Sequence, residues 1–253
     1  MTDTLQKASM WKRISAGLFD GILLAVVAVL CAWLISVVVQ YDAHSQSLAD
    51  AYARYEEQYG VNFTTAVNDY DTLTEEEIAR VDEANAALGT DDEAMYHYEM
   101  LLQLTLVIAS LGILMAYLIM EFAVPRILGN GQTFGKKIFG IGLMHQDATR
   151  ISGVSLFIRS ILGKYTIETM IPVLLILMMS FGAIGVVAPA LIAALLVAEI
   201  VMIIATRTNS LIHDKISSTV CVDVGSQRIF ASREELIAYK QRQHADAAAR
   251  KPY

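Results

Sequence analysis

The fold is decided by residues 169–205, TMIPVLLILMMSFGAIGVVAPALIAALLVAEIVMIIA, an apolar run of 37 residues. A helix needs about 20 apolar residues to cross a bilayer, so this run is nearly twice the length of one span. Gly182, Gly185 and Pro189 interrupt it near its middle, where glycine and proline favour a turn. The run therefore predicts two short membrane-spanning helices joined as a tight hairpin.

Two further apolar runs are each long enough for one span. Residues 14–39 contain Asp20 as their one charged residue, and residues 101–124 contain Glu121 as theirs. The chain of 253 residues is 55% hydrophobic and 18% charged, with a mean hydropathy of +0.46, whereas soluble domains carry about a quarter charged residues. This composition argues against a soluble enzyme and against intrinsic disorder. We expect an all-α polytopic membrane protein with four transmembrane helices.

Basic residues are distributed unevenly along the chain. Residues 1–13, 125–168 and 206–253 carry 17 of the 19 lysines and arginines, whereas residues 40–100 carry two, against fifteen acidic residues. Basic residues close to the spans stay on the cytoplasmic side, so four spans place both termini in the cytoplasm. Three spans would put the basic C-terminal segment outside, against this rule. We expect a small acidic ectodomain, with a formal charge of −13, between the first and second spans.

Local patterns make this ectodomain helical. Thr74 with Glu77, and Thr90 with Glu93, fit the capping box that begins many helices. The first span is followed by neither Gly nor Pro until Gly60, so we expect it to continue outward as a helix that ends there. The predicted parts are an N-terminus with the first span (1–39), the acidic extracytoplasmic segment (40–100), the second span (101–124), a basic cytoplasmic loop with interfacial helices (125–168), the third and fourth spans (169–206) and a cytoplasmic tail (207–253).

Three carboxylates lie inside the predicted spans, namely Asp20, Glu121 and Glu199. An ionisable group there costs at least about 2.5–3.5 kcal/mol, so each carboxylate is a candidate for binding a transported ion. Counted from the nearest basic residue, all three lie at comparable depths from the cytoplasmic face. The alternative is that each carboxylate pairs with an arginine or lysine and only fixes the packing of the helices.

Small residues predict where two of these carboxylates meet. Gly17 and Gly21 on the first span, and the alanines at positions 190, 194 and 198 on the last, allow helix backbones to approach closely. This approach would bring Asp20 towards Glu199. Two neighbouring carboxylates raise each other's pKa and can exchange a proton for a metal ion.

The glycine-rich loop 129–140, GNGQTFGKKIFG, differs from a nucleotide-binding P-loop. The residue five positions before Gly135 is Asn130, and Lys136 is followed by Lys137 rather than by Ser or Thr. We interpret the loop as an interfacial segment that touches anionic lipid headgroups.

Four parts of the chain carry a resemblance to a known family. They are RISAGLFD at 13–20, GQTFGKKIFG at 131–140, Arg159, and LIHDKISSTV at 211–220. In this order they resemble the RDD family of membrane proteins, over residues 8–224. The resemblance implies that Arg13, Asp20 and Asp214 are the three residues that name the family, and that its motifs also include Gly131, Gln132, Thr133, Gly135, Lys136, Arg159 and His213. The chain departs from the family in its long outer segment and in Lys215 and Ser217–Ser218, where apolar and small residues are more usual.

The resemblance implies a role related to transport, and some members are linked to sodium–proton exchange. We therefore expect a small secondary transporter that exchanges protons for monovalent cations such as sodium, with Asp20, Glu199 and Glu121 as ion-binding candidates. It would be a multi-pass protein of a bacterial plasma membrane, embedded in the lipid bilayer as a homo-oligomer, because four spans are few for a transporter.

The alternative function is a non-transporting scaffold or accessory subunit whose acidic ectodomain binds a partner. An ion pair between Arg13 and Asp214 would then act as a latch between the first and last helices. No nucleophile motif and no His or Cys cluster with metal spacing is present, so we expect no enzyme activity, no catalytic residues, no metal site and no cofactor. The net charge of −7 argues against a nucleic-acid partner.

Overall fold

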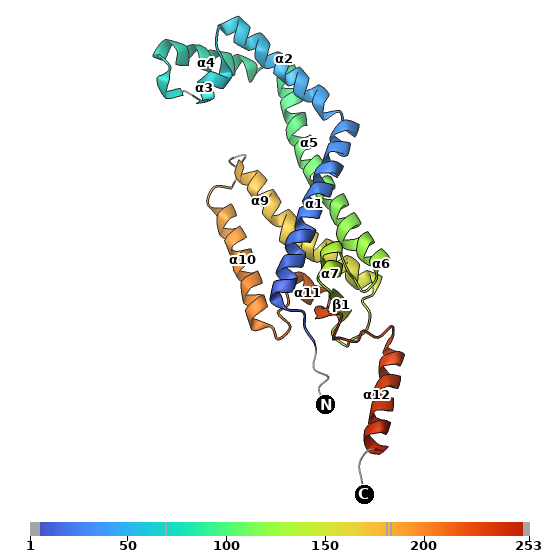
Figure 1. The fold of residues 1–253 in the computed structure, drawn as a ribbon. Coiled ribbons are helices and arrows are strands. Elements are labelled where there is room, and N and C mark those ends of the chain that lie inside the picture. Colours follow the sequence, from blue (N-terminus) through green and yellow to red (C-terminus); the bar gives the residue numbers. More distant parts are fainter. Residues whose placement is uncertain (1–5, 69, 181, 183, 250–253) are drawn as a thin grey trace. The chain divides into compact units, whose positions relative to one another are not determined.

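The computed structural model describes residues 6–68, 70–180, 182 and 184–249 (Figure 1). In this part of the chain, four helices are long and apolar enough to cross a membrane: Met10–Val38, Asp92–Leu128, Gly153–Ser180 and Val187–Ala205. The expected number of spanning helices is therefore confirmed by length and composition. The predicted segments 1–39 and 207–253 extend at their outer ends beyond the described residues. The chain forms two compact units, one made of Met1–Ala28 with Ile113–Tyr253 and the other of Val29–Gly112.

The third of these helices begins at Gly153, whereas the apolar pattern put its start at Thr169. It consists of α8 (Gly153–Phe157), the π-helix η3 (Ile158–Met170) and α9 (Ile171–Ser180). Hydropathy misses its first half because Arg159, Lys164 and Glu168 interrupt the apolar pattern there. The 37-residue run continues into α10 (Val187–Ala205), and Figure 1 shows α9 and α10 side by side.

The unit Val29–Gly112 is built from helices with a small core of their own. It holds α2 (Tyr41–Tyr59), α3 (Phe63–Asn68), the 3₁₀ turn η1 (Tyr70–Thr72), α4 (Glu75–Leu88) and most of α5 (Asp92–Tyr117). Ala51, Leu88 and Ala94 are buried together at its centre. The acidic segment is therefore helical, as expected.

Its helix boundaries correct two predictions. The capping box of Thr74 and Glu77 is present at the start of α4. The second predicted box is wrong, because Asp91 caps α5 by accepting the backbone N–H groups of Glu93 and Ala94 at 3.0 and 3.1 Å. The first span does not continue outward either, since α1 ends at Val38 and Gln40 has a φ of 56°. Gly60, with a φ of 62°, ends α2 rather than a continuous first helix.

The other unit contains the start of α1 (Met10–Val38), η2 (Leu118–Ala123), α6 (Val124–Leu128), α7 (Phe134–Ile138), α11 (Ile212–Ile216) and α12 (Arg233–Ala249). A two-stranded antiparallel sheet pairs β1 (Ile141–His145) with β2 (Thr219–Asp223), with Leu143 opposite Cys221. The all-α expectation missed this sheet. It holds the loop 129–140 and the segment 211–220, which are far apart in sequence, next to each other.

Candidate functional site

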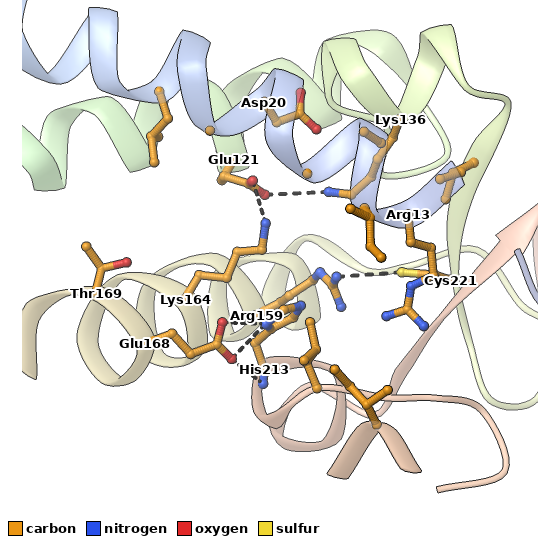
Figure 2. A pocket seen from close by; sticks show the side chains of 18 of the residues that line it. Arg13, Asp20, Glu121, Lys136, Arg159, Lys164, Glu168, Thr169, His213 and Cys221 are labelled. Atoms are coloured by element: carbon orange, nitrogen blue, oxygen red, sulfur yellow. Dashed lines mark hydrogen bonds and ion pairs between the residues drawn. The ribbon is translucent and has the colours of Figure 1, made fainter. Parts of the chain in front are cut away.

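A cavity of about 410 Å³ lies in the unit that contains α7 and α11, and charged side chains surround it (Figure 2). Its walls come from α1, α5, η2, α7, β1, η3, α10, α11 and β2. Apolar residues such as Met10, Ile14 and Leu24 line part of it. The ionisable residues with acidic or basic side chains in its lining are Arg13, Asp20, Glu121, Lys136, Arg159, Lys164, Glu168 and His213. Seven of the predicted motif and ion-binding residues are therefore found around one cavity or directly behind it.

Asp214 is the centre of the ion network behind this cavity. It is 1% exposed, and its two carboxylate oxygens pair separately with Arg159 and with Arg13, the latter at 3.1 Å. The backbone N–H of Leu211 donates to the same oxygen as Arg13, at 3.1 Å. Burial would raise the pKa of Asp214, but the charges of Arg159 and Arg13 hold that pKa well below its usual range. The ion pair expected between Arg13 and Asp214 is present, and Arg159 is a second partner that spacing could not reveal.

His213 connects α11 to the π-helix η3. Its Nδ1 lies 2.7 Å from both carboxylate oxygens of Glu168, and its backbone N–H donates to Glu168 Oε1 at 3.0 Å. A Cβ on Gly163 would lie 2.5 Å from the Cβ of His213, so this close packing requires a glycine in η3. Burial, with the positive charge of Arg159, lowers the pKa of His213 to about 4. The imidazole is therefore neutral at pH 7 and donates its Nδ1 proton to Glu168.

The lowered pKa of His213 predicts that the protein loses stability in mild acid. The unfolded chain binds a proton near pH 6.5, whereas the folded chain does so only near pH 4. Stability from this residue is therefore present above pH 6.5 and lost as the pH falls towards 4, by about 2 kcal/mol between pH 7 and pH 5. Thermal unfolding in detergent at both pH values measures this loss. In His213→Gln the loss should be smaller by that amount, and an unchanged pH dependence would contradict the assignment.

Glu121 lies between two lysines. Lys164 donates to its Oε1, and Lys136 Nζ lies 3.6 Å from its Oε2, too far for a hydrogen bond. Lys136 is 8% exposed, and its Nζ has no hydrogen-bond partner among the described residues. Burial lowers the pKa of this ammonium group. Lys136 is thus a buried cation held mainly by the negative charge of Glu121.

Proline explains why Glu121 and Glu168 lie on π-helical segments. Pro125 has no N–H to donate to the carbonyl of Glu121, four residues earlier, and Pro172 stands in the same relation to Glu168. The preceding amides bond one residue further back, as Ile171 does to the carbonyl of Thr166. π-helical turns of this kind are frequent at functional sites. The two glutamates therefore share a local backbone arrangement beside the cavity.

Asp20 accepts hydrogen bonds from the residues at the start of α7. Thr133 Oγ1 donates to one oxygen of Asp20, and the backbone N–H of Gly135 donates to the other at 2.7 Å. A Cβ on Gly135 would lie 2.5 Å from the carbonyl oxygen of Ala16, so only glycine allows this approach of α7 to α1. Asp20 thus has a structural contact at each oxygen.

The loop 129–140 is built to make that contact. Gly131 has a φ of 61°, and a Cβ there would lie 2.8 Å from Leu143, while the side-chain amide of Gln132 donates to the carbonyl of Ile141 at 2.8 Å. Lys136 is buried and points towards Glu121 (Figure 2), so of the two lysines in this loop only Lys137 is placed for the predicted contact with lipid headgroups, which stays a prediction. The short α7 buries one basic residue and leaves Lys137 exposed.

The predicted meeting of Asp20 and Glu199 does not occur. Glu199 Oε2 accepts the backbone N–H of Ile212 at 3.3 Å, and Glu199 is not part of the cavity wall. Gly17 and Gly21 line the cavity, and a Cβ built on either residue would have no atom within 4 Å. Neither glycine therefore lies at a close contact between two helices. The alanines at 190, 194 and 198 are exposed. Helical spacing gave the depth of the two carboxylates but not the direction in which each helix face points.

Comparison with known proteins gives one match. The family model described as RDD family matches residues 7–218, from the β-bridge residue Lys7 to the residue before β2. No match was found among the curated proteins or among the solved structures.

Proposed function

Since this chain belongs to the RDD family of membrane proteins, we propose that it is a small secondary transporter that exchanges protons for monovalent cations such as sodium. The observation that carries the proposal is the contact of Glu121 with Lys136, whose buried ammonium group lacks a hydrogen-bond partner. Following the distribution of basic residues, we place both termini in the cytoplasm of a bacterial cell and the protein in its plasma membrane.

The exchange needs a site that holds either a proton or a cation, but not both. With His213 neutral, four basic side chains balance four acidic ones around the cavity: Arg13, Lys136, Arg159 and Lys164 against Asp20, Glu121, Glu168 and Asp214. When Lys136 loses its proton, Glu121 keeps Lys164 as its charged partner, but the cavity as a whole is left with one unbalanced negative charge in a medium of low dielectric constant. A monovalent cation restores the balance, and a returning proton on Lys136 displaces it. One proton then crosses for each cation.

The other charged groups hold the site in place. Asp20 and Asp214 have hydrogen bonds or ion pairs at both oxygens, so neither offers a free ligand. Glu199 has one buried oxygen, Oε1, without a hydrogen-bond partner among the described residues, but it lies outside the cavity wall. Glu121 lines the cavity beside Lys136 and is therefore the preferred member of the three ion-binding candidates. We also propose a homo-oligomer, because the small-residue face of α10 is exposed in the single chain.

Glu121→Gln is expected to abolish exchange, because with a neutral amide at this position the loss of the Lys136 proton leaves no unbalanced negative charge for a cation to neutralise. Purified protein in liposomes with a preset pH gradient and an internal pH dye is given sodium, lithium and potassium in turn. Wild type should collapse the gradient with at least one cation, and Glu121→Gln should leak no faster than empty liposomes. Glu199→Gln is the matched control, since Glu199 lies outside the cavity wall, and it should exchange like wild type.

Two results would contradict this proposal in different ways. Exchange at the wild-type rate by folded Glu121→Gln would show that Glu121 is not the exchange site, while the proposed transport function would stand. If wild type does not collapse the pH gradient with any cation, the proposed transport function is wrong. That result would favour a scaffold or accessory subunit whose acidic helical segment binds a partner. The satisfied contacts of Asp20 and Asp214 are the observation that favours that second function.

A further inference from the structure

Two histidines meet in the unit Val29–Gly112, which contains none of the cavity residues. His44 on α2 and His97 on α5 place their Nδ1 atoms 3.0 Å apart, with ring centroids separated by 5.2 Å. The ring of Tyr96 packs edge-on against both, at 6.0 and 5.2 Å. Both histidines are partly exposed. The pair is therefore preformed on two neighbouring helices and open to solvent.

The contact determines the protonation of the pair. A hydrogen bond between two Nδ1 atoms requires a proton on one of them and a lone pair on the other. Imidazole nitrogens with free lone pairs are the commonest protein ligands for transition metals. When the donor ring carries its proton on Nε2 instead of Nδ1, both rings stay neutral and both Nδ1 lone pairs are free for a metal ion, once each ring turns to direct its Nδ1 at the ion.

The spacing favours a particular coordination geometry. Metal–nitrogen bonds of about 2.0–2.1 Å to two atoms 3.0 Å apart give an angle of about 90–100° at the metal. This angle matches adjacent positions of a square-planar or octahedral site, whereas a tetrahedral site needs a separation of about 3.3–3.4 Å. Copper(II) and nickel(II) prefer the first two geometries, and copper(II) binds nitrogen ligands more tightly.

The surrounding charge favours a cation. Residues 40–100 carry fifteen acidic and two basic side chains, which raises the local concentration of cations. No group of three or more His, Cys, Asp and Glu side chains with metal-binding geometry occurs in the described residues. We propose that His44 and His97 bind a divalent transition-metal ion of the copper(II) and nickel(II) class, with water at its remaining positions. The site is independent of the exchange proposed at Glu121.

The test uses the full chain in detergent, purified without a polyhistidine tag. Calorimetric titration with copper(II) should give one site per chain, and copper(II) electron paramagnetic resonance should show two imidazole nitrogens. His44→Gln and His97→Gln should each weaken binding at least about tenfold, since loss of even an outer-shell partner costs 10–100-fold. His244→Gln, on the exposed face of α12, is the matched control and should bind like wild type.

Two outcomes would overturn the proposal. Equal binding by wild type and either glutamine variant would place the metal elsewhere, and equal competition by calcium or magnesium would assign binding to the acidic surface, since these ions prefer oxygen ligands. The spectrum of the wild-type chain decides the question even if a variant misfolds, because a signal without two imidazole nitrogens contradicts the site directly.

Discussion

Asp214→Asn is expected to lower the free energy of unfolding by about 3–5 kcal/mol, the cost of removing one partner from a buried ion pair. The substitution keeps the size of the side chain but removes the charge that faces both Arg159 and Arg13. Arg159 is 2% exposed, so its charge would be left buried without the carboxylate that now balances it. Because Arg13 lies on α1 and Arg159 on η3, the change should loosen α11 from both helices.

Asp223→Asn is the matched control for this prediction. Asp223 also pairs with a basic residue, Lys12 at 2.6 Å, but both side chains are partly exposed. Pairs of this kind are screened by water and contribute little. Chemical unfolding in detergent, followed by circular dichroism, should show a clear loss for Asp214→Asn and almost none for Asp223→Asn. Equal losses, or a wild-type transition for Asp214→Asn, would mean that Asp214 does not hold the helices together.

The sequence predicted this latch because its two ends were both visible as motif residues. The length of the apolar runs likewise predicted four spanning helices, since hydropathy depends on local composition alone. The start of the third helix at Gly153 was missed for the same reason. Arg159 and Lys164 lower the local hydropathy, and their burial depends on Asp214 and Glu121, which lie elsewhere in the sequence.

The partners of the buried carboxylates could not be predicted from spacing. Asp20, Glu121 and Glu199 lie at similar depths along their helices, but spacing does not specify which helix each side chain faces. Asp20 meets Thr133 and Gly135 because the pairing of β1 with β2 fixes the loop after α6. Glu121 meets Lys136 for the same reason. The positions of glycine in the loop were a usable signal, because a glycine in a short helix often marks a close backbone approach.

Gly135→Ala tests that close approach and is expected to lower the free energy of unfolding by about 3 kcal/mol. The new Cβ would lie 2.5 Å from the carbonyl oxygen of Ala16 and 3.0 Å from the carboxylate carbon of Asp20, so α7 must move away from α1. Asp20 then loses the N–H of Gly135, and Lys136 moves with the same short helix. Cation exchange should fall together with stability if Lys136 and Glu121 form the exchange site.

Gly21→Ala makes the same chemical change, but it is expected to raise the free energy of unfolding rather than lower it. No atom lies within 4 Å of a Cβ at Gly21, and the position is inside the long helix α1, so alanine should raise the free energy of unfolding by about 0.5–1 kcal/mol. Thermal unfolding of the two variants beside wild type measures both effects. If Gly135→Ala unfolds at or above the wild-type temperature, α7 does not depend on Asp20, and the contact cannot be what positions Lys136 beside Glu121.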